Sequence, residues 1–408
     1  MKKVFFLLST IFFLNISVKA QQEKPGFGIS FSGFVKTDIM YDTRQTVAIR
    51  EGHFLLYPSP ELMDKNNVDI NAKSNFNILS IQTRLTGKII APDAFGARTS
   101  GQIEGEFFGT TDGDINGFRL RHAFVKLDWE NTSLLIGQTW HPMFVTDMFP
   151  GVVSFNTGAP FQPFSRNPQI RFSYAIDEVK FIVAVIAQRD FQSNGPGGFS
   201  SIYLRNSVIP NLHAQVQYSS NGHLAGVGID YKKLTPRIVT TKNIATDASV
   251  SGFSALGFIK LNLDPVTLKA QGIYGQNIPD LMQIGGYAVK STDATTGVES
   301  YTALSNFTVW GELSTGKQTE YALFFGYSKA LGASDNITGA YYGRATDIEN
   351  IFRISPRIQF NSEKTIVSTE VEFTSAGYGT PNGLNKGKIE NVKTVSNLRL
   401  LLAFNYFF

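Results

Sequence analysis

The feature that most constrains this chain is a two-residue alternation of apolar and polar side chains. In the segment 27–42, FGISFSGFVKTDIMYD, the odd positions from Phe27 to Tyr41 are mostly aromatic or aliphatic, whereas the even positions carry serine, lysine and aspartate. A period of two is typical of a β-strand whose two faces meet different environments. The alternation recurs at 79–89, 97–107 and 352–360. Because no segment shows a convincing helical period, we predict an all-β fold.

The links between the predicted strands fall into two length classes that alternate along the chain. The short links lie at 92–96, 130–133, 177–178, 219–222, 264–265, 314–317 and 361–364. The long, polar links lie at 43–73, 109–117, 141–168, 191–210, 234–249, 278–300, 330–348 and 376–392. Transmembrane barrels sort their loops in this way, with short periplasmic turns and longer extracellular loops. The pattern predicts an antiparallel transmembrane β-barrel of about 16 strands.

Two of the predicted strands are weak, which leaves strand counts of 14 and 18 open. The strand around 133–140 is short, and the strand around 203–218 is interrupted by Pro210. Proline cannot donate to the hydrogen-bond ladder of a sheet, so it argues against a central strand at that position.

The two ends of the chain are typical of a Gram-negative outer-membrane protein. Lys2 and Lys3 precede an apolar run and a small-residue cleavage site that ends at Ala20. This is the layout of a cleavable signal peptide, so we expect export of residues 21–408 as a single barrel domain after removal of residues 1–20. The final strand alternates and closes on Phe408, which resembles the signal that outer-membrane assembly machinery recognises. The chain has no cysteine, as is common in bacterial envelope proteins of this size.

Composition and motifs argue against several other functions. Loss of Lys2, Lys3 and Lys19 with the signal lowers the formal charge from +4 to +1, so net charge does not favour a nucleic-acid partner. None of the five histidines sits at a zinc-ligand spacing and no G-x-S-x-G motif occurs, so neither an enzyme nor a cofactor or metal is expected. The run 112–117, DGDING, matches the start of an EF-hand loop, but Ala123 stands where a bidentate glutamate is required. An extracellular turn is the favoured interpretation, and calcium there is left open.

Within the predicted barrel, the segment 81–174 resembles a known family. The motifs TRLTGK, GQIEGEFFG, GFRLRHAFVKLDW, LLIGQTW and RNPQIRFSY follow one another in the order found in DcaP-like porins. The opening GFVKTDIMYD and the later PNLHAQVQYSSNGHLAGVGIDYKKL fit the same pattern. The resemblance implies a trimeric outer-membrane porin with a basic constriction, associated with uptake of small anions such as dicarboxylates. Family members often carry a coiled-coil extension before the barrel, whereas only QQEKPG separates the predicted signal from the first strand here.

The polar face of each strand would line a water-filled pore in a barrel of this size. The predicted pore and anion-binding residues are Arg84, Arg98, Arg119, Arg121, Arg166, Arg171, Arg353, Arg357 and Arg399. The predicted lumenal acidic residues are Glu104, Glu106, Glu370 and Glu372. The arginines fall on strands near the seam between the first and last strands, so we expect them to share one arc of the wall. Such groups would select for anions, or each arginine would only pair with a lumenal carboxylate and stiffen the wall.

Two local features each leave a choice open. The link 141–168 is rich in aromatics and prolines, so it either folds inward to narrow the pore, the favoured interpretation, or packs at a subunit interface. In the segment 117–129, Phe118 and Leu120 should face outward and Arg119 and Arg121 the pore, but the same alternation then places Lys126 in the membrane. Either a bulge after His122 shifts the register, or Lys126 reaches the periplasmic rim.

The sequence therefore predicts a porin that is a passive diffusion channel for small hydrophilic solutes, with a bias toward anions such as small carboxylates. The alternative is a structural or adhesive barrel that acts through its extracellular loops. The expected partners are small anionic solutes, membrane lipid and further copies of the chain in a homotrimer, without nucleic acid.

Overall fold

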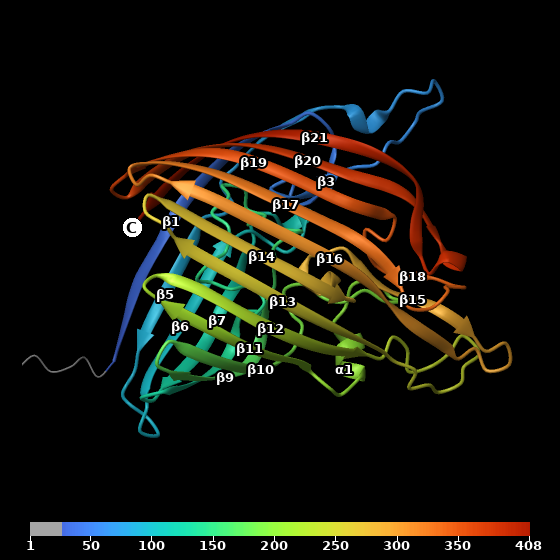
Figure 1. Cartoon of the computed structure of the whole chain (residues 1–408), viewed down its shortest axis with the longest axis horizontal. Helices are drawn as coiled ribbons and strands as arrows, with labels where there is room; N and C mark the ends of the chain where they lie inside the picture. The colour runs from blue at the N-terminus through green and yellow to red at the C-terminus, as the bar shows by residue number, and fades with distance from the viewer. Residues whose placement is uncertain (1–26) are drawn as a thin grey trace, which may run out of the picture.

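The computed structural model describes residues 27–408, and the predicted signal peptide lies outside the described residues. Antiparallel strands form a closed 16-stranded barrel, as predicted, in which each strand pairs with its neighbours in the chain (Figure 1). The first barrel strand, β1 (Gly28–Asp42), closes the seam by pairing with the last, β21 (Lys388–Phe407), from Phe34 opposite Phe407 to Asp42 opposite Arg399. Closure matters because only a barrel without edges satisfies every strand's backbone hydrogen bonds in lipid.

The second barrel strand is interrupted and consists of β4 (Asn75–Leu79) and β5 (Arg84–Ile90), both of which pair with β1. The remaining barrel strands are β6 (Arg98–Phe107), β7 (Phe118–Asp128), β8 (Thr132–Trp140), β9 (Arg166–Ile176), β10 (Val179–Ile186), β11 (Asn211–Ser220), β12 (His223–Leu234), β13 (Val250–Asn262), β14 (Val266–Gln276), β16 (Glu299–Thr315), β17 (Thr319–Ala333), β19 (Ile348–Ser362) and β20 (Thr365–Asn382). The links contain β2 (Thr46–Ile49), β3 (Phe54–Pro58), β15 (Gly285–Thr292), β18 (Tyr341–Arg344), the helix α1 (Ile202–Asn206) and the 3-10 turns Ile70–Ala72, Asp112–Asp114, Pro279–Leu281 and Gly383–Asn385. Across residues 27–408, helices of the length and apolarity that would cross a membrane are absent.

The sorting of links into short and long is confirmed on one side of the barrel and corrected at two points on the other. All seven short turns lie where predicted. The segment 376–392 is not a loop, because β20 continues to Asn382 and β21 starts at Lys388. These strands have 18 and 20 residues, whereas about 9–11 residues span a bilayer. They are therefore long enough to project beyond the membrane on the long-loop side.

The weak strand around 203–218 is also corrected. Residues 202–206 form the short helix α1, and β11 begins only at Asn211, directly after Pro210. Proline thus marks the boundary of the strand, which agrees with its inability to donate a ladder hydrogen bond. The other weak strand is confirmed as β8.

A β-bulge resolves the register of β7. On β6 and β7, Glu104 pairs with His122 but Gly105 pairs with Leu120, so Arg121 is the extra residue. Beyond the bulge Val125 is exposed on the outer face, while Lys126 forms an ion pair with Asp128 at 2.6 Å. The bulge interpretation is confirmed, although the extra residue precedes His122, and the interpretation that Lys126 extends from the membrane face is wrong.

The interior of the barrel is filled by two of the long links, which we call loop 1 (residues 43–74) and loop 3 (residues 141–165). Loop 1 contributes the hairpin β2–β3, in which Phe54 and Leu56 are fully buried. Loop 3 contributes Phe144, Phe155 and Phe161 among others to the same apolar cluster. Burying one such side chain stabilises a fold by roughly 1.5–3 kcal/mol. The favoured inward fold of the link 141–168 is therefore confirmed.

Candidate pore constriction

Loop 3 is fastened across the lumen by hydrogen bonds between its main chain and charged side chains of distant strands. The Val153 amide donates to Glu370 Oε2 at 2.7 Å, and the Val153 carbonyl accepts from Lys36 Nζ at 2.9 Å. The Gly151 amide donates to Glu312 Oε2 at 2.6 Å. The acceptors lie on β16 and β20 and the donor on β1, so loop 3 is held from strands on both sides of the seam.

Beside loop 3, an arginine cluster joins Arg84, Arg119, Arg121 and Arg166 to the carboxylates of Glu104, Glu106 and Asp190. Alternation places Arg84 on β5, the two glutamates on β6 and Arg119 on β7 facing inward, and the bulge keeps Arg121 on the same side. Glu106 is at its centre: Oε1 lies 2.6 Å from Arg121 Nη1 and 2.7 Å from Arg119 Nη2, and Oε2 lies 3.1 Å from Arg84 Nη2.

Asp190, in the link after β10, extends the cluster toward loop 3. Its carboxylate lies 2.7 Å from Arg166 Nη2 and 3.1 Å from Arg119 Nη1. Burial alone would raise the pKa of Asp190, but the neighbouring Arg166 and Arg119 guanidinium groups hold it below its ordinary value. Asp190 is therefore a permanent anion at physiological pH, and in this cluster four guanidinium groups face three carboxylates.

Aromatic rings of loop 3 and of Trp140 at the end of β8 support the cluster. The Arg166 guanidinium lies 4.8 Å from the centroid of the Trp140 ring and 5.3 Å from that of Phe164. Trp140 in turn stacks on Phe144 at 3.9 Å. Cations are attracted to aromatic faces, so these rings hold the Arg166 side chain in one position between the wall and the loop.

A cavity of about 730 Å³ opens beside loop 3. Its lining includes Arg84, Arg121, Glu104 and Lys36, residues 149–155 of loop 3, and Phe407 near the end of the chain. Because Phe407 lies at the short-turn end of β21, this cavity is the part of the lumen on the periplasmic side of loop 3. The side chain of Arg84, which is 20% exposed, thus reaches the solvent of this cavity, whereas that of Arg121 borders it and is only 3% exposed.

The predicted arginines share one arc of the wall, from β19 across the seam to β9, as expected, but they do not all line the pore. Arg353 Nη1 and Nη2 donate to the carbonyl oxygens of Ala159 and Leu56, each at 2.7 Å. Arg399 binds both carboxylate oxygens of Asp42 and the Gly52 carbonyl. Both side chains are only 1% exposed, so they hold loops 1 and 3 in place and do not line a pore.

Three further predicted arginines lie outside the cluster. Arg357 pairs with Glu312 at 2.8 Å and with Glu320. Arg98 stands at the short-turn rim with its side chain 77% exposed, 3.8 Å from Asp128. Arg171 donates to Gln169 Oε1 at 2.9 Å and to the Trp140 carbonyl oxygen at 2.5 Å, and thus has only neutral acceptors among its hydrogen bonds.

The predicted carboxylates also divide into two groups. Glu104 and Glu106 pair with arginines of the cluster, as the wall-stiffening alternative proposed. Glu370 instead accepts from the loop 3 main chain, and Glu372 accepts from Asn156 of loop 3 at 3.1 Å while lying 3.4 Å from Arg353. Within the run 112–117, Asp112–Asp114 form a 3-10 turn, and Asp112 accepts a hydrogen bond from the Glu51 amide.

Sequence reasoning missed several charged residues of the lumen. Lys260 on β13 donates to the Asp147 carbonyl oxygen of loop 3 at 3.2 Å, and Lys180 lies on the same face of β10 as the buried Ile182. The alternation rule applied to β10 and β13 would have found both lysines. Asp190 gave no such signal, because it lies in an irregular link whose path the pattern does not predict.

The fold and the inward loop define an outer-membrane porin: a 16-stranded barrel with short turns on one side and a lumen narrowed by a loop from the other. Residues 16–216 match the model of the family described as DcaP outer membrane protein, and the chain belongs to this family.

Solved structures agree with this fold. The outer membrane channel DcaP of Acinetobacter baumannii has a TM-score of 0.69 and 15% identity, over 95% of this chain and 99% of that chain. The outer-membrane expressed OmpT of Vibrio cholerae has a TM-score of 0.55 and 11% identity, over 95% and 99%. The anion-selective porin from Comamonas acidovorans has a TM-score of 0.54 and 12% identity, over 94% and 100%. At these identities the similarity concerns the fold alone. No curated protein matches the chain.

Proposed function

We propose that this porin is a passive diffusion channel for small hydrophilic solutes that favours anions, including small carboxylates. The arginine cluster carries the proposal, because it places four guanidinium groups against three carboxylates beside the loop that narrows the lumen. Arginine keeps its charge at any working pH and presents a fork that matches a carboxylate. A narrow polar lumen between low-dielectric walls concentrates the field of such an excess charge.

Lysines and Arg171 add to the positive potential on the way to the cluster. Lys260 and Arg171 have uncharged oxygen atoms as their hydrogen-bond acceptors, so these bonds leave their positive charge uncompensated. Within the cluster, Arg84 and Arg119 keep 20% and 10% of their side chains exposed. A solute carboxylate could therefore exchange between these donors without a protein group having to leave, which suits a channel because tight binding would stop flux. One porin of the same fold is named as anion-selective.

The reversal potential of single channels in a potassium chloride gradient tests this proposal. We expect wild-type channels to favour chloride, and Arg84→Gln and Arg171→Gln each to lower the chloride-to-potassium permeability ratio by roughly twofold or more, as expected when a lumenal charge is lost. Arg98→Gln is the matched control, because this side chain is exposed at the rim and should leave the ratio unchanged.

Cation preference of the wild-type channel would contradict the anion bias while leaving the porin itself intact. A purified, folded barrel that never conducts would instead favour the structural or adhesive alternative. Liposome swelling measures the rate at which a solute enters. A higher rate for a dicarboxylate than for a neutral solute of equal size would identify carboxylates as favoured solutes.

We also propose that the chain assembles as a homotrimer after export by its signal peptide. One of the solved structures that share the fold, OmpT of Vibrio cholerae, is described in a trimer form. Native mass spectrometry in mild detergent should give three chains per particle. The mature protein, after removal of the signal peptide, should begin at Gln21. A particle of one chain would contradict the trimer, and an unprocessed N-terminus would contradict the signal peptide.

A further inference from the structure

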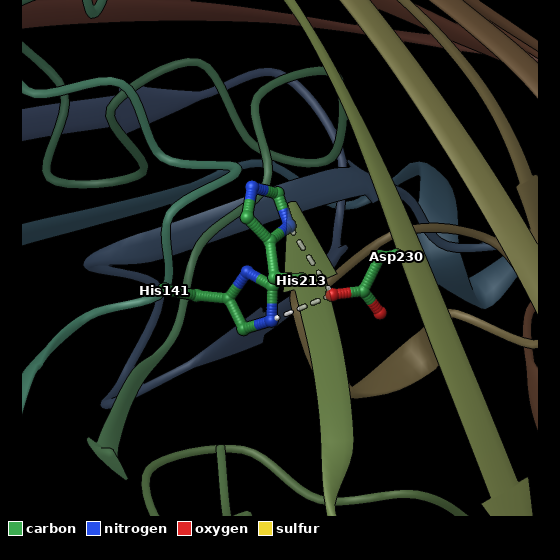
Figure 2. Close-up of side chains that lie close together, drawn as sticks. All are labelled: His141, His213 and Asp230. Atoms are coloured by element: carbon green, nitrogen blue, oxygen red, sulfur yellow. Dashed lines mark ion pairs between the residues drawn. The ribbon is translucent and has the colours of Figure 1, made fainter. Parts of the chain in front are cut away.

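Three buried side chains converge where loop 3 leaves the barrel wall. His141 is the first residue of loop 3, His213 lies on β11 and Asp230 on β12, and β11 and β12 place His213 directly opposite Asp230. Figure 2 shows one carboxylate oxygen of Asp230 facing a ring nitrogen of each histidine. Asp230 Oδ2 lies 3.4 Å from His141 Nε2 and 3.4 Å from His213 Nδ1. All three atoms lie within 4.8 Å of one another.

These three atoms are buried and have no hydrogen-bond partner among the described residues. Buried polar atoms without a partner are rare in folded proteins and require a specific reason. The reason is clearest at His213, whose Nε2 lies 2.9 Å from Gln215 Oε1. This bond leaves Nδ1 as the ring nitrogen that is directed at the Asp230 carboxylate. A cation between His213 Nδ1 and Asp230 Oδ2 would give both atoms a partner.

We propose that His141, His213 and Asp230 form a binding site for a divalent transition-metal ion, best matched by zinc. Two imidazoles and one carboxylate are a donor set that zinc accepts, and bonds of about 2.0–2.1 Å place tetrahedral ligands about 3.4 Å apart. That separation is the one found between Asp230 Oδ2 and each histidine. The bond from His213 to Gln215 is the kind of outer contact that orients a metal-binding imidazole.

Binding requires one local change, at His141. Its Nδ1 accepts a long hydrogen bond from the Met143 amide at 3.3 Å. Coordination through Nε2 would move the ring proton to Nδ1, so this bond would be exchanged for the bond to the metal. The nearest other charges are two cations, of which Lys232 is compensated by Asp280, whereas Arg171 is bonded only to uncharged oxygen atoms and opposes a bound cation. The carboxylate of Asp230 is the group that offsets this repulsion.

The position of the site implies what the metal would do. His141 belongs to the loop that narrows the pore, whereas His213 and Asp230 belong to the wall. A bound ion would therefore join loop 3 to β11 and β12, a part of the wall other than β16 and β20, whose glutamates fasten the same loop. It would stabilise the constriction without taking part in solute binding.

Metal content of the purified protein tests the proposal. Protein made without a histidine tag in zinc-supplemented cells, then dialysed against metal-free buffer, should hold one zinc per chain by inductively coupled plasma mass spectrometry. Asp230→Asn and His213→Gln should lower this content at least tenfold. His53→Gln is the matched control, because His53 is also buried and paired with a carboxylate, that of Asp38, but lies outside the site.

Folding is checked by the heat-dependent mobility of barrels in gel electrophoresis, and the nearly isosteric Asp230→Asn carries the test if His213→Gln does not fold. Added cobalt(II) should give the visible bands of tetrahedral coordination in wild type and in His53→Gln, and these should be absent in Asp230→Asn. Wild-type protein without zinc and without cobalt bands would overturn the proposal on its own. Equal metal content in wild type and both site variants would also overturn it.

Discussion

At the scale of single residues, Glu106 decides how much positive charge the constriction can hold. It is fully buried, and its two oxygens accept hydrogen bonds from Arg84, Arg119 and Arg121. Like charges this close repel one another unless a carboxylate lies between them. Glu106 therefore sets a balance between the stability of the wall and the strength of the anion-attracting field.

The substitution Glu106→Gln separates these two effects. Removing one partner of a buried ion pair leaves uncompensated charge, so we expect the free energy of unfolding to fall by roughly 3–5 kcal/mol. In the channels that still form, the chloride-to-potassium permeability ratio should rise. Urea unfolding of the reconstituted barrel and reversal potentials measure the two quantities.

The control is Glu61→Gln, which removes a pair with Lys393, a side chain that is 66% exposed. Exposed pairs contribute about 0–1 kcal/mol, so this variant should behave as wild type. Unchanged stability and unchanged selectivity in Glu106→Gln would show that the cluster is not coupled in the way described.

At the scale of structural elements, loop 3 fits against the wall because one strand lacks a side chain at the point of contact. A Cβ atom at Gly326 on β17 would lie 2.4 Å from Cδ2 of Phe161 in loop 3. Gly326→Val should therefore displace loop 3 and, as overpacking does, destabilise the protein by roughly 1–3 kcal/mol.

Single-channel recording is the second readout for this variant, which should show larger current fluctuations than wild type because the constriction is no longer held in one position. Gly272→Val on β14 is the control, because no atom lies within 4 Å of a Cβ at Gly272. Current fluctuations and stability equal to those of wild type in Gly326→Val would contradict the proposed packing.

The elements were predictable where one local rule decides them. Alternation alone identifies the strands, because a lipid-facing side and a lumenal side impose it on every residue of a barrel wall. The bulge at Arg121 appeared as a break in that alternation, and the aromatic content of loop 3 indicated burial. The extension of β20 and β21 beyond the membrane was not predictable, because a strand in water shows no lipid-facing side.

At the scale of the whole molecule, the barrel has one face for lipid and one for its own loops. Ile103 and Gln102 are neighbours on β6, but Ile103 is exposed on the outside and Gln102 lines the lumenal cavity. Arginine on the lipid side of a barrel costs roughly 2–4 kcal/mol near the bilayer midplane, whereas lumenal substitutions tune selectivity.

We therefore expect Ile103→Arg to lower the free energy of unfolding in lipid vesicles by an amount in that range, and Gln102→Arg to leave it nearly unchanged while raising chloride preference. Each variant serves as the control for the other, since the same side chain is added one position apart. Equal destabilisation by both would mean that β6 does not have the orientation described.

The whole-molecule arrangement also limited what the sequence could predict about the site. Alternation placed Arg353 and Arg399 inside the barrel correctly, but it could not show that loops 1 and 3 would occupy that space and take these arginines as hydrogen-bond donors. The contacts join residues separated by 194, 297 and 347 positions. No local pattern carries such information, so two of the nine predicted pore arginines proved to hold the loops.

The attachment of loop 3 has a consequence for the order in which the protein is assembled. Its main chain is held by Glu312 and Glu370, which lie 161 and 217 residues further along the chain, and by Lys36 of the first strand. When loop 3 is synthesised and delivered, most of these partners do not yet exist beside it. The constriction formed by loop 3 can therefore be completed only when the last strand pairs with the first. A closed seam is thus the condition for a working constriction.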